Sequence, residues 1–400
     1  MLQEAVFASS NTCHWGSTTF DLLDTVRAAI WLVHRYRFIP SSLYTCNGLR
    51  CAREMFEILY PDRRFALGCE SLANMFVTIG QFEKTEPKDS IFAILGLLDK
   101  DKSLESSQAA LLEVDYAKSL SSVLRDATRY SLCQGVDLGA FNLINHHLDV
   151  LDDRQSFPTW VVRADLQREA WDASHLPAYF NASGGLEAPS LLDDISLGAE
   201  VLLLQGIVVD EICQTTATCL RSTWEIHEEF NEWLISVKGI VLRHCNVASR
   251  EELYLVTAFT LVAGHTWGGE RAQSCDLQVL LDYLKSLTPD DNDEAPNGDR
   301  ITKDSDSGKM NSMRGASFVE ICVERCFFVT GAGRVGIGPR CMQTGDVIVV
   351  LRGGELPFVL RKKGDGYWLL GEAYVHGIMD GEAVQLHKAR GGLEEVFHIR

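Results

Sequence analysis

Short apolar runs separated by glycine-rich turns dominate the C-terminal part of the chain. The turns fall at Gly353-Gly354, Gly364-Asp365-Gly366 and Gly371. The runs between them are rich in β-branched and aromatic residues and cover 347–351, 358–361, 367–370 and 374–378. Runs of this length, about ten residues apart with turn residues between them, predict a small antiparallel sheet or barrel.

Upstream of these runs, apolar residues recur mainly at helical spacing. The segment 21–38 predicts an amphipathic helix that ends before Pro40, because proline cannot continue a helix. A short buried helix is predicted over 86–96 with Asp89 as its cap, and a longer helix follows Asp115, which is expected to cap it. Further helices are predicted over 49–60, 70–82, 224–237, 251–262 and 275–287.

One apolar strand lies among these helices. The segment EVLLLQGIVVD at 200–210 is β-branched, and Gly206 predicts a kink in it. A lone apolar strand needs a partner sheet, and the nearest strong strand pattern is C-terminal. We therefore expect this strand to pair with the C-terminal strands, which makes the helices that follow it an insertion.

The fold class predicted is α+β, a helical body plus a small antiparallel β-barrel at the C-terminus. The segment 288–315 is polar and rich in Asp, Asn, Ser and Gly, so it is expected to form a disordered acidic linker. The predicted units are a helical body at 21–175, strands joining the barrel at 176–212, a helical insertion at 222–287 and the barrel at 316–400.

The motif G-x-G-x-x-G is present from Gly331 to Gly336, after the strand-like RCFFVT and about twenty residues before Glu355. In a dinucleotide site these glycines open a helix, whose N-terminus binds the pyrophosphate. Here Gly338-Pro339 follows at once and another strand begins soon afterwards, which leaves no room for such a helix. The motif is interpreted as a glycine-rich β-turn.

Composition is ordinary for a globular protein, with 46% hydrophobic and 23% charged residues. The formal net charge of −18 arises upstream, because the segment from Ala316 onward has ten acidic and ten basic residues. No basic stripe follows the chain, so nucleic-acid binding is not expected. The longest apolar runs fall short of the ~20 residues that span a bilayer, and no secretion signal is recognised.

Candidate chemistry is sparse. His227-Glu228 begins the zinc motif H-E-x-x-H, but Asn231 stands where the second histidine is needed. The adjacent His146 and His147 point in different directions and make a poor pair of ligands. None of the twelve cysteines forms C-x-x-C, so reduced and mostly buried thiols are expected. We assign no catalytic, cofactor-binding or metal-ligating residue and no cofactor, and expect the tryptophans to serve core packing.

Seven segments follow one another over nearly the whole chain: MLQEAVFASSNTCHWG, EPKDSIFAILGLLD, VDYAKSLSSVLRDATRYSL, FPTWVVRADL, RCFFVTGAGRVGIGP, TGDVIVVLRGGELPFVLR and LLGEAYVHGIMDGEA. Together and in this order they resemble the heterokaryon-incompatibility (HET) domain proteins of filamentous fungi.

The chain also departs from the family pattern. The family's Y-x-x-L-S-Y-x-W-G and W-I-D-x-x-C-I-N-Q blocks are absent, so residues 1–20 resemble only the end of a HET domain, and an N-terminal truncation is expected. The resemblance implies a non-enzymatic regulator of non-self recognition and programmed cell death, cytoplasmic, with other proteins of that response as partners. Two alternatives stay open: a TIR-like NAD-consuming remnant that retains Glu4, and a barrel that binds a peptide or small ligand through the Gly331–Pro339 loop.

Overall fold

The computed structural model describes two compact units. It describes residues 10–35, 84–96, 110–134, 138–146, 157–166, 180–187, 200–220, 227–245, 249–266, 270–287 and 321–400, with a few isolated positions between them. Unit 1 comprises residues 1–136 and 161–173, and unit 2 comprises residues 137–160 and 174–400. The segment 137–160, expected within the helical body, thus belongs to unit 2 with the barrel strands. Glu4 and the linker expected at 288–315 lie outside the described residues.

The described part of unit 1 is mainly helical. It begins with a hairpin of β1 (Thr12–Trp15) and β2 (Thr18–Asp21), which leads directly into α2. Its helices are α2 (Leu22–Arg35), the short α6 (Asp89–Phe92), the 3-10 turn η1 (Ala110–Leu112) and α8 (Leu120–Gln134). The inner face of α8 buries Val123, Ala127 and Tyr130, as the apolar spacing predicts.

Unit 2 is built on an eight-stranded sheet in the order β10-β8-β7-β6-β3-β4-β5-β9. Its strands are β3 (Leu202–Thr215), β4 (Arg325–Thr330), β5 (Val335–Pro339), β6 (Val347–Leu351), β7 (Phe358–Lys363), β8 (Gly366–Glu372), β9 (Tyr374–Val375) and β10 (Glu395–Ile399). The strand expected at 200–210 is therefore part of the C-terminal sheet, and the α+β prediction is confirmed.

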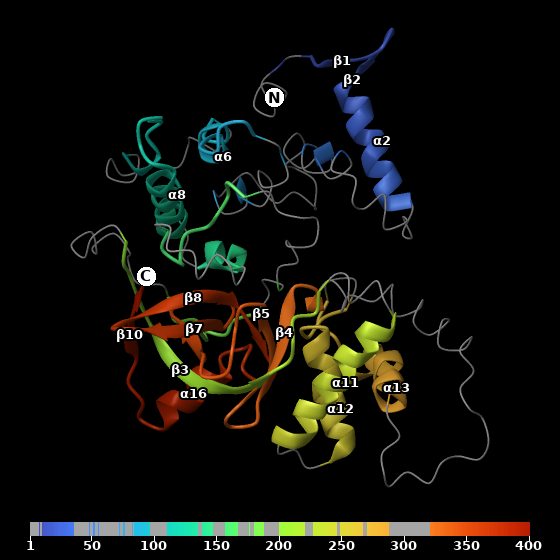
Figure 1. Cartoon of the computed structure of the whole chain (residues 1–400), viewed down its shortest axis with the longest axis vertical. Coiled ribbons are helices and arrows are strands. Elements are labelled where there is room, and N and C mark those ends of the chain that lie inside the picture. Colours follow the sequence, from blue (N-terminus) through green and yellow to red (C-terminus); the bar gives the residue numbers. More distant parts are fainter. Residues whose placement is uncertain are drawn as a thin grey trace. The chain divides into compact units, whose positions relative to one another are not determined.

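The long curved strand β3 lies in the middle of the sheet order and also pairs with β10 at one end (Figure 1). Its first half pairs with β10, its middle with β6 and its last residues with β4. Because β10 also meets β8 at Ile399 and Tyr367, the pairings β3-β6-β7-β8-β10 return to β3 in a ring. Among the strands of this ring, β3 is the one that comes from far upstream in the sequence.

The kink expected at Gly206 does not coincide with a shift of the pairing register. The register shifts of β3 fall later, between Val208 and Asp210 and between Ile212 and Gln214. Gly206 instead allows a close approach of β6, because a Cβ there would stand 2.3 Å from the carbonyl oxygen of Val350. A larger residue at this position would clash with the backbone of β6, which cannot move aside as a flexible side chain can.

The helices of unit 2 are α11 (His227–His244), α12 (Arg250–Leu261), α13 (Gln278–Ser286) and α16 (Glu382–Ala389), with 3-10 turns η2 (Gly139–Leu143) and η4 (Ser274–Leu277). Helix α11 packs against β4, and α12 packs against β5 and α13 (Figure 1). The inner stripe of α11 buries Phe230, Trp233, Leu234 and Val237. No described helix is long and apolar enough to cross a membrane.

Three local elements differ from the sequence predictions. The segment 335–339, interpreted as part of a turn, is the fully buried strand β5, and α16 and β10 were not predicted. Packing requires glycine at position 336, because a Cβ there would lie 2.3 Å from the ring of Phe328. Glycine adds no apolar side chain to the alternating pattern, so the pattern did not reveal this strand. The prediction that Asp89 caps α6 is also wrong. The N-cap residue is Lys88, and its side chain makes no capping hydrogen bond.

Candidate functional site

The glycine motif at Gly331 forms the turn between β4 and β5. A carboxylate of the chain lies where a dinucleotide's pyrophosphate would be expected. The amide of Ala332 donates to Oδ2 of Asp210 at 3.0 Å, and Nη1 of Arg334 lies 3.5 Å from the same oxygen. The amide of Gly331 donates to the carbonyl of Glu211 at 2.9 Å. These contacts clamp the hairpin onto β3 at its bulge, so the loop is a structural turn.

In unit 1, two of the motifs that carry the family resemblance are bonded to each other. The hydroxyl of Tyr116 donates to Oδ1 of Asp89 at 2.6 Å, and Nζ of Lys88 donates to the carbonyl of Tyr116 at 2.7 Å. The ring of Tyr116 meets Phe92 edge-on with centroids 5.0 Å apart. The bond to Asp89 raises the pKa of Tyr116. Asp89 therefore fixes Tyr116 in place, which is a different role from the helix cap predicted for it.

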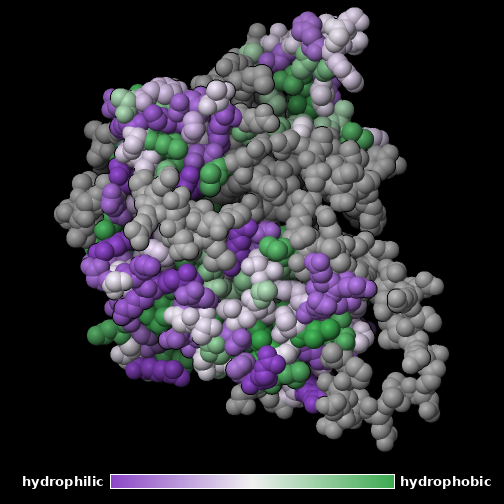
Figure 2. Space-filling view, in the orientation of Figure 1, coloured by the Kyte–Doolittle hydropathy of each residue, from purple (hydrophilic) through white to green (hydrophobic). Residues whose placement is uncertain are grey.

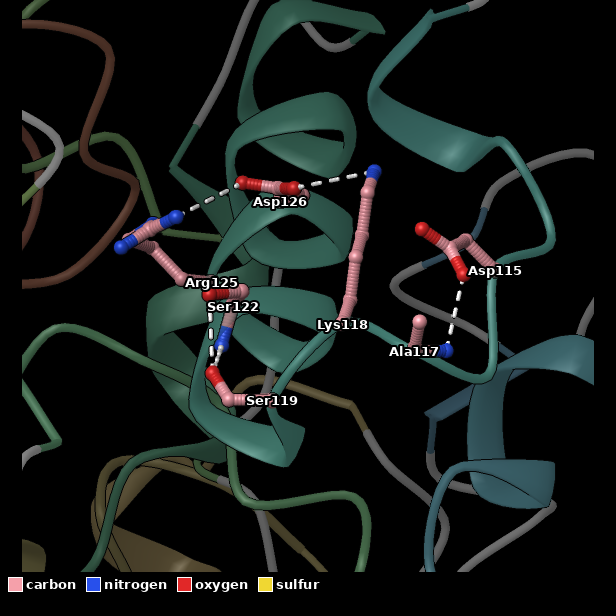
Figure 3. Close-up of polar contacts among 7 residues, drawn as sticks. All are labelled: Asp115, Ala117, Lys118, Ser119, Ser122, Arg125 and Asp126. Carbon is pink, nitrogen blue, oxygen red and sulfur yellow. Dashed lines mark hydrogen bonds and ion pairs between the residues drawn. The ribbon is translucent and has the colours of Figure 1, made fainter.

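The start of α8 is held by a second set of polar contacts (Figure 3). Oγ of Ser119 accepts from the amide of Ser122 at 3.1 Å, which is the contact of an N-cap residue. The predicted cap, Asp115, instead accepts from the amide of Ala117 at 2.8 Å and closes the turn before the helix. The prediction of Asp115 as the cap is wrong, because the helix begins at Leu120.

The end of the segment FPTWVVRADL is bonded to these helices of unit 1. Oγ1 of Thr128 on α8 accepts from the amide of Val162 at 3.1 Å, and Nζ of Lys84 donates to the carbonyl of Ala164 at 2.7 Å. Arg163 forms a two-bond ion pair with Asp165 at 2.8 Å. Burial lowers the pKa of Lys84, and the nearby Asp165 offsets part of that shift. These bonds join the segment to α8 and to the residues before α6, which indicates a structural role.

The start of that segment belongs to unit 2 and binds the sheet. Oγ1 of Thr159 donates to the carbonyl of Arg400 and accepts from the amide of Leu369 at 2.9 Å. Trp160 is fully buried, and its Nε1 donates to the carbonyl of Glu200 at 3.0 Å. The pair Thr159-Trp160 thus binds the middle of β8, the residue after β10 and the residues just before β3.

A group of ionisable side chains with shifted pKa values lies in unit 2, around Arg271. A bridge between His265 and Arg271 closes the connection that follows α12. Arg271 reaches Asp380, which follows β9, through Nη1 to Oδ2 at 2.9 Å and Nη2 to Oδ1 at 2.6 Å. Both side chains stay half-exposed, at 47% and 49%. We call Phe180, His265, Arg271, Tyr374, His376 and Asp380 the Arg271 cluster.

Aromatic rings form the base of this cluster. The guanidinium of Arg271 lies over the ring of Phe180 at 4.4 Å. Phe180 in turn packs on His265 and Tyr374, with ring centroids 5.9 and 5.8 Å away. An arginine with one face on an aromatic ring and a bidentate carboxylate partner is held in a single orientation. The cluster therefore presents a fixed, half-exposed Arg–Asp pair.

Burial determines the protonation states in the cluster. It lowers the pKa of His265 to about 4, with a further contribution from the charge of Arg271. It also lowers the pKa of His376 and raises that of Tyr374. At neutral pH His265 is therefore neutral and Tyr374 keeps its proton. Nδ1 of His265 lies 3.0 Å from the carbonyl of Val262, which indicates that Nδ1 carries the hydrogen.

Acid is expected to destabilise unit 2 through His265. Its pKa is lower in the folded protein than the 6.5 of the exposed side chain, so the unfolded state binds more protons between those values. The contribution of His265 to stability is complete above about pH 6.5 and is lost as pH falls towards 4. Urea unfolding measured across this pH range should show a smaller decrease in the free energy of unfolding for His265→Gln than for the unchanged chain. Parallel profiles would contradict this assignment.

Other residues of candidate chemistry have structural contacts. Asn231 accepts a hydrogen bond from the hydroxyl of Tyr283. Nε2 of His146 lies 2.9 Å from the carbonyl of Thr159. Nε1 of Trp233 donates to the carbonyl of Ala217 at 2.9 Å. His147, Trp171, Trp224 and Trp267 lie outside the described residues. Within the described ranges, no group of His, Cys, Asp or Glu has an arrangement that could hold a metal ion.

The described cysteines are all free, and four are fully buried: Cys219, Cys322, Cys326 and Cys341. Burial raises the pKa of Cys219 and Cys341 to about 12 and that of Cys326 to about 11. Thiols with such pKa values stay protonated and unreactive at neutral pH. They pack as small hydrophobic side chains. The expectation that most cysteines are buried is wrong for the described residues, because the other six described cysteines are intermediate or exposed.

The match to a family model lies in the C-terminal part of the chain. Residues 281–392 match the Het-6 beta-barrel domain. A segment of 59 residues is 49% identical to the heterokaryon incompatibility protein 6, OR allele, of Neurospora crassa. That segment is 14% of this chain and 9% of the relative, so the match spans a small part of the relative's length. No solved structure matches the chain.

The family match covers β4 to β9 and α16, the strands on which the sequence resemblance also rests. Among the described residues, this stretch also contains Tyr374, His376 and Asp380 of the Arg271 cluster. In its C-terminal part the chain is accordingly similar to the Het-6 beta-barrel domain, and over a short segment it is similar to a fungal heterokaryon-incompatibility protein.

Proposed function

We propose that this chain is a non-enzymatic recognition protein of the incompatibility response, which binds another protein through the Arg271 cluster and so contributes to non-self recognition and cell death. The observation that carries the proposal is the half-exposed Arg271–Asp380 pair on its aromatic base. Arginine and aromatic side chains dominate the residues that contribute most to protein interfaces. An arginine that is already oriented loses little freedom on binding, which favours affinity.

The protonation states favour binding over catalysis at this cluster. A general acid or base works best when its pKa lies near the working pH. The pKa of His265 is about 4, and that of Tyr374 is raised by burial. Both shifts move the groups away from neutrality, so neither is suited to proton transfer there. The same shifts keep the surface around Arg271 in one charge state across the physiological range.

The test is the effect of Arg271→Ala on the incompatibility response. The chain is expressed in a fungal strain of the incompatible type, and viable transformants are counted against an empty vector. The unchanged chain should reduce their number, and Arg271→Ala should restore it. An interface arginine of this kind contributes about 2 kcal/mol or more, so partner binding should weaken about 30-fold.

Arg400→Ala is the matched control. Its ion pair with Asp365 is 2.7 Å long, the side chains are 46% and 76% exposed, and it lies in the same unit. This variant should leave transformant numbers as low as the unchanged chain does, and circular dichroism should show both variants folded. Equal effects of the two substitutions, or no effect of the unchanged chain, would contradict the proposal. Cleavage of NAD by the purified chain would favour an enzymatic effector instead.

A further inference from the structure

The segment from α16 to β10 places large apolar side chains in solvent. Leu393 is 85% exposed, Val396 is 50% exposed and Leu386 is 40% exposed. Figure 2 shows hydrophilic and hydrophobic residues interspersed over the visible face. Exposed leucines are common singly, but three large apolar residues within one short segment indicate a contact surface.

The turn between α16 and β10 has a defined backbone. The amide of Gly392 donates to the carbonyl of His387 at 3.0 Å, and Nε2 of His387 lies 3.1 Å from the carbonyl of Leu393. β10 then pairs with β3 along Glu395–Ile399. Leu393 is thus held between a helix end and a strand start, so its exposure is a property of an ordered turn.

Charges of both signs flank the apolar residues. Lys388 and Arg390 lie at the end of α16, and Glu394 and Glu395 lie at the start of β10; all four residues are exposed. Glu394 also forms an ion pair with Arg352 at 3.1 Å, so Glu395 supplies most of the negative charge on the acidic side. We call the four exposed charged residues, with Leu386, Leu393 and Val396, the α16–β10 surface. A surface with a basic side, an apolar centre and an acidic side is complementary to its own copy turned by 180°. The basic side of one copy then faces the acidic side of the other.

The charge distribution of the whole chain favours this approach between two copies. The net charge is −18, but the residues from Ala316 onward contain ten acidic and ten basic residues. Two copies therefore repel each other least when their C-terminal parts meet. A different acidic or basic partner would be complementary to only one side of the surface, which makes a second copy the better fit.

We propose that the α16–β10 surface joins two copies of this chain in a two-fold symmetric dimer. The proposal stands on this surface alone and does not depend on the function of the Arg271 cluster. The surface is small, so the dimer is expected to be weak and reversible, with a dissociation constant on the order of micromolar.

Sedimentation equilibrium of the full chain, from about 1 to 300 µM, tests this inference over the range expected for a weak dimer. The unchanged chain should pass from monomer to dimer over this range. Leu393→Glu should weaken self-association at least about tenfold, because it places a charge at the apolar centre and close to its symmetry mate. Val279→Glu is the matched control, since Val279 is 54% exposed on α13, outside the surface, and should leave the dimer unchanged.

Charge reversal tests the symmetry of the dimer. Arg390→Glu and Glu395→Arg should each weaken self-association, because each variant places like charges opposite each other. An equimolar mixture of the two variants should dimerise as well as the unchanged chain, since every contact then joins opposite charges. A chain that stays monomeric at the highest concentration would overturn the proposal and leave the surface to a different protein. Failure of the mixture to recover would also overturn it.

Discussion

Replacing Glu372 with alanine is expected to lower the free energy of unfolding of unit 2 by about 3–5 kcal/mol. Glu372 and Arg325 form an ion pair at 2.5 Å with side chains 1% and 6% exposed. Oε1 of Glu372 also accepts from the amide of Leu176 at 2.8 Å. Removal of the carboxylate leaves the arginine charge buried without this ion-pair partner and the amide without this acceptor. A buried charge that loses its counter-charge carries the full cost of its desolvation.

Urea unfolding followed by circular dichroism measures this loss. Glu395→Ala removes a carboxylate that is exposed to solvent, so its effect on stability should stay within about 0.5 kcal/mol. The double substitution Arg325→Met with Glu372→Leu should recover most of the stability, because it removes both charges together. If Glu372→Ala destabilises no more than Glu395→Ala, the ion pair does not stabilise the sheet as described.

The second large effect is expected for Trp160→Ala, which should destabilise unit 2 by about 3–5 kcal/mol. Trp160 is fully buried, so truncation leaves a cavity and removes dispersion contacts with its neighbours. It also removes the bond from Nε1 to the carbonyl of Glu200, at the residues just before β3. Because β3 pairs with β10, β6 and β4, a loosened start of this strand affects the whole ring of pairings.

The measurement is the shift of the urea midpoint at unchanged slope, which reports a change in stability. Trp160→Phe keeps much of the apolar volume and should cost less than Trp160→Ala. Trp31→Ala is the exposed control, since Trp31 on α2 is 59% exposed and should change stability by about 0.5 kcal/mol or less. Equal losses for Trp160→Ala and Trp31→Ala would contradict the role assigned to Trp160.

Periodic apolar patterns predicted the elements of this chain well where side chains alternate or recur clearly. The strand over 347–351 has the bounds predicted, and the inner stripe of α11 is buried as predicted. The pattern failed for β5, whose sequence VGIGP has two glycines at positions where neighbouring rings and backbone pack closely. It also missed β10, where Phe397 and Ile399 are buried but Val396 is 50% exposed.

The candidate site could not be identified from the sequence. Phe180, Arg271 and Asp380 lie far apart along the chain and in segments with no shared motif. Their relation follows from the fold, because the connection after α12 and the residues after β9 meet beside Phe180. The one signal available in the sequence was the resemblance in LLGEAYVHGIMDGEA, which contains Tyr374, His376 and Asp380.

The sequence by itself determined the fold class, the β-rich C-terminal part and the resemblance to heterokaryon-incompatibility proteins, because these depend on local periodicity and on motif order. It also predicted that the glycine motif at Gly331 is a turn. Only the tertiary structure showed that the carboxylate of Asp210 binds that turn, and that β3 pairs with β10, β6 and β4. It also decided which ionisable groups change their pKa. These properties depend on contacts between distant segments, which local patterns along a chain do not encode.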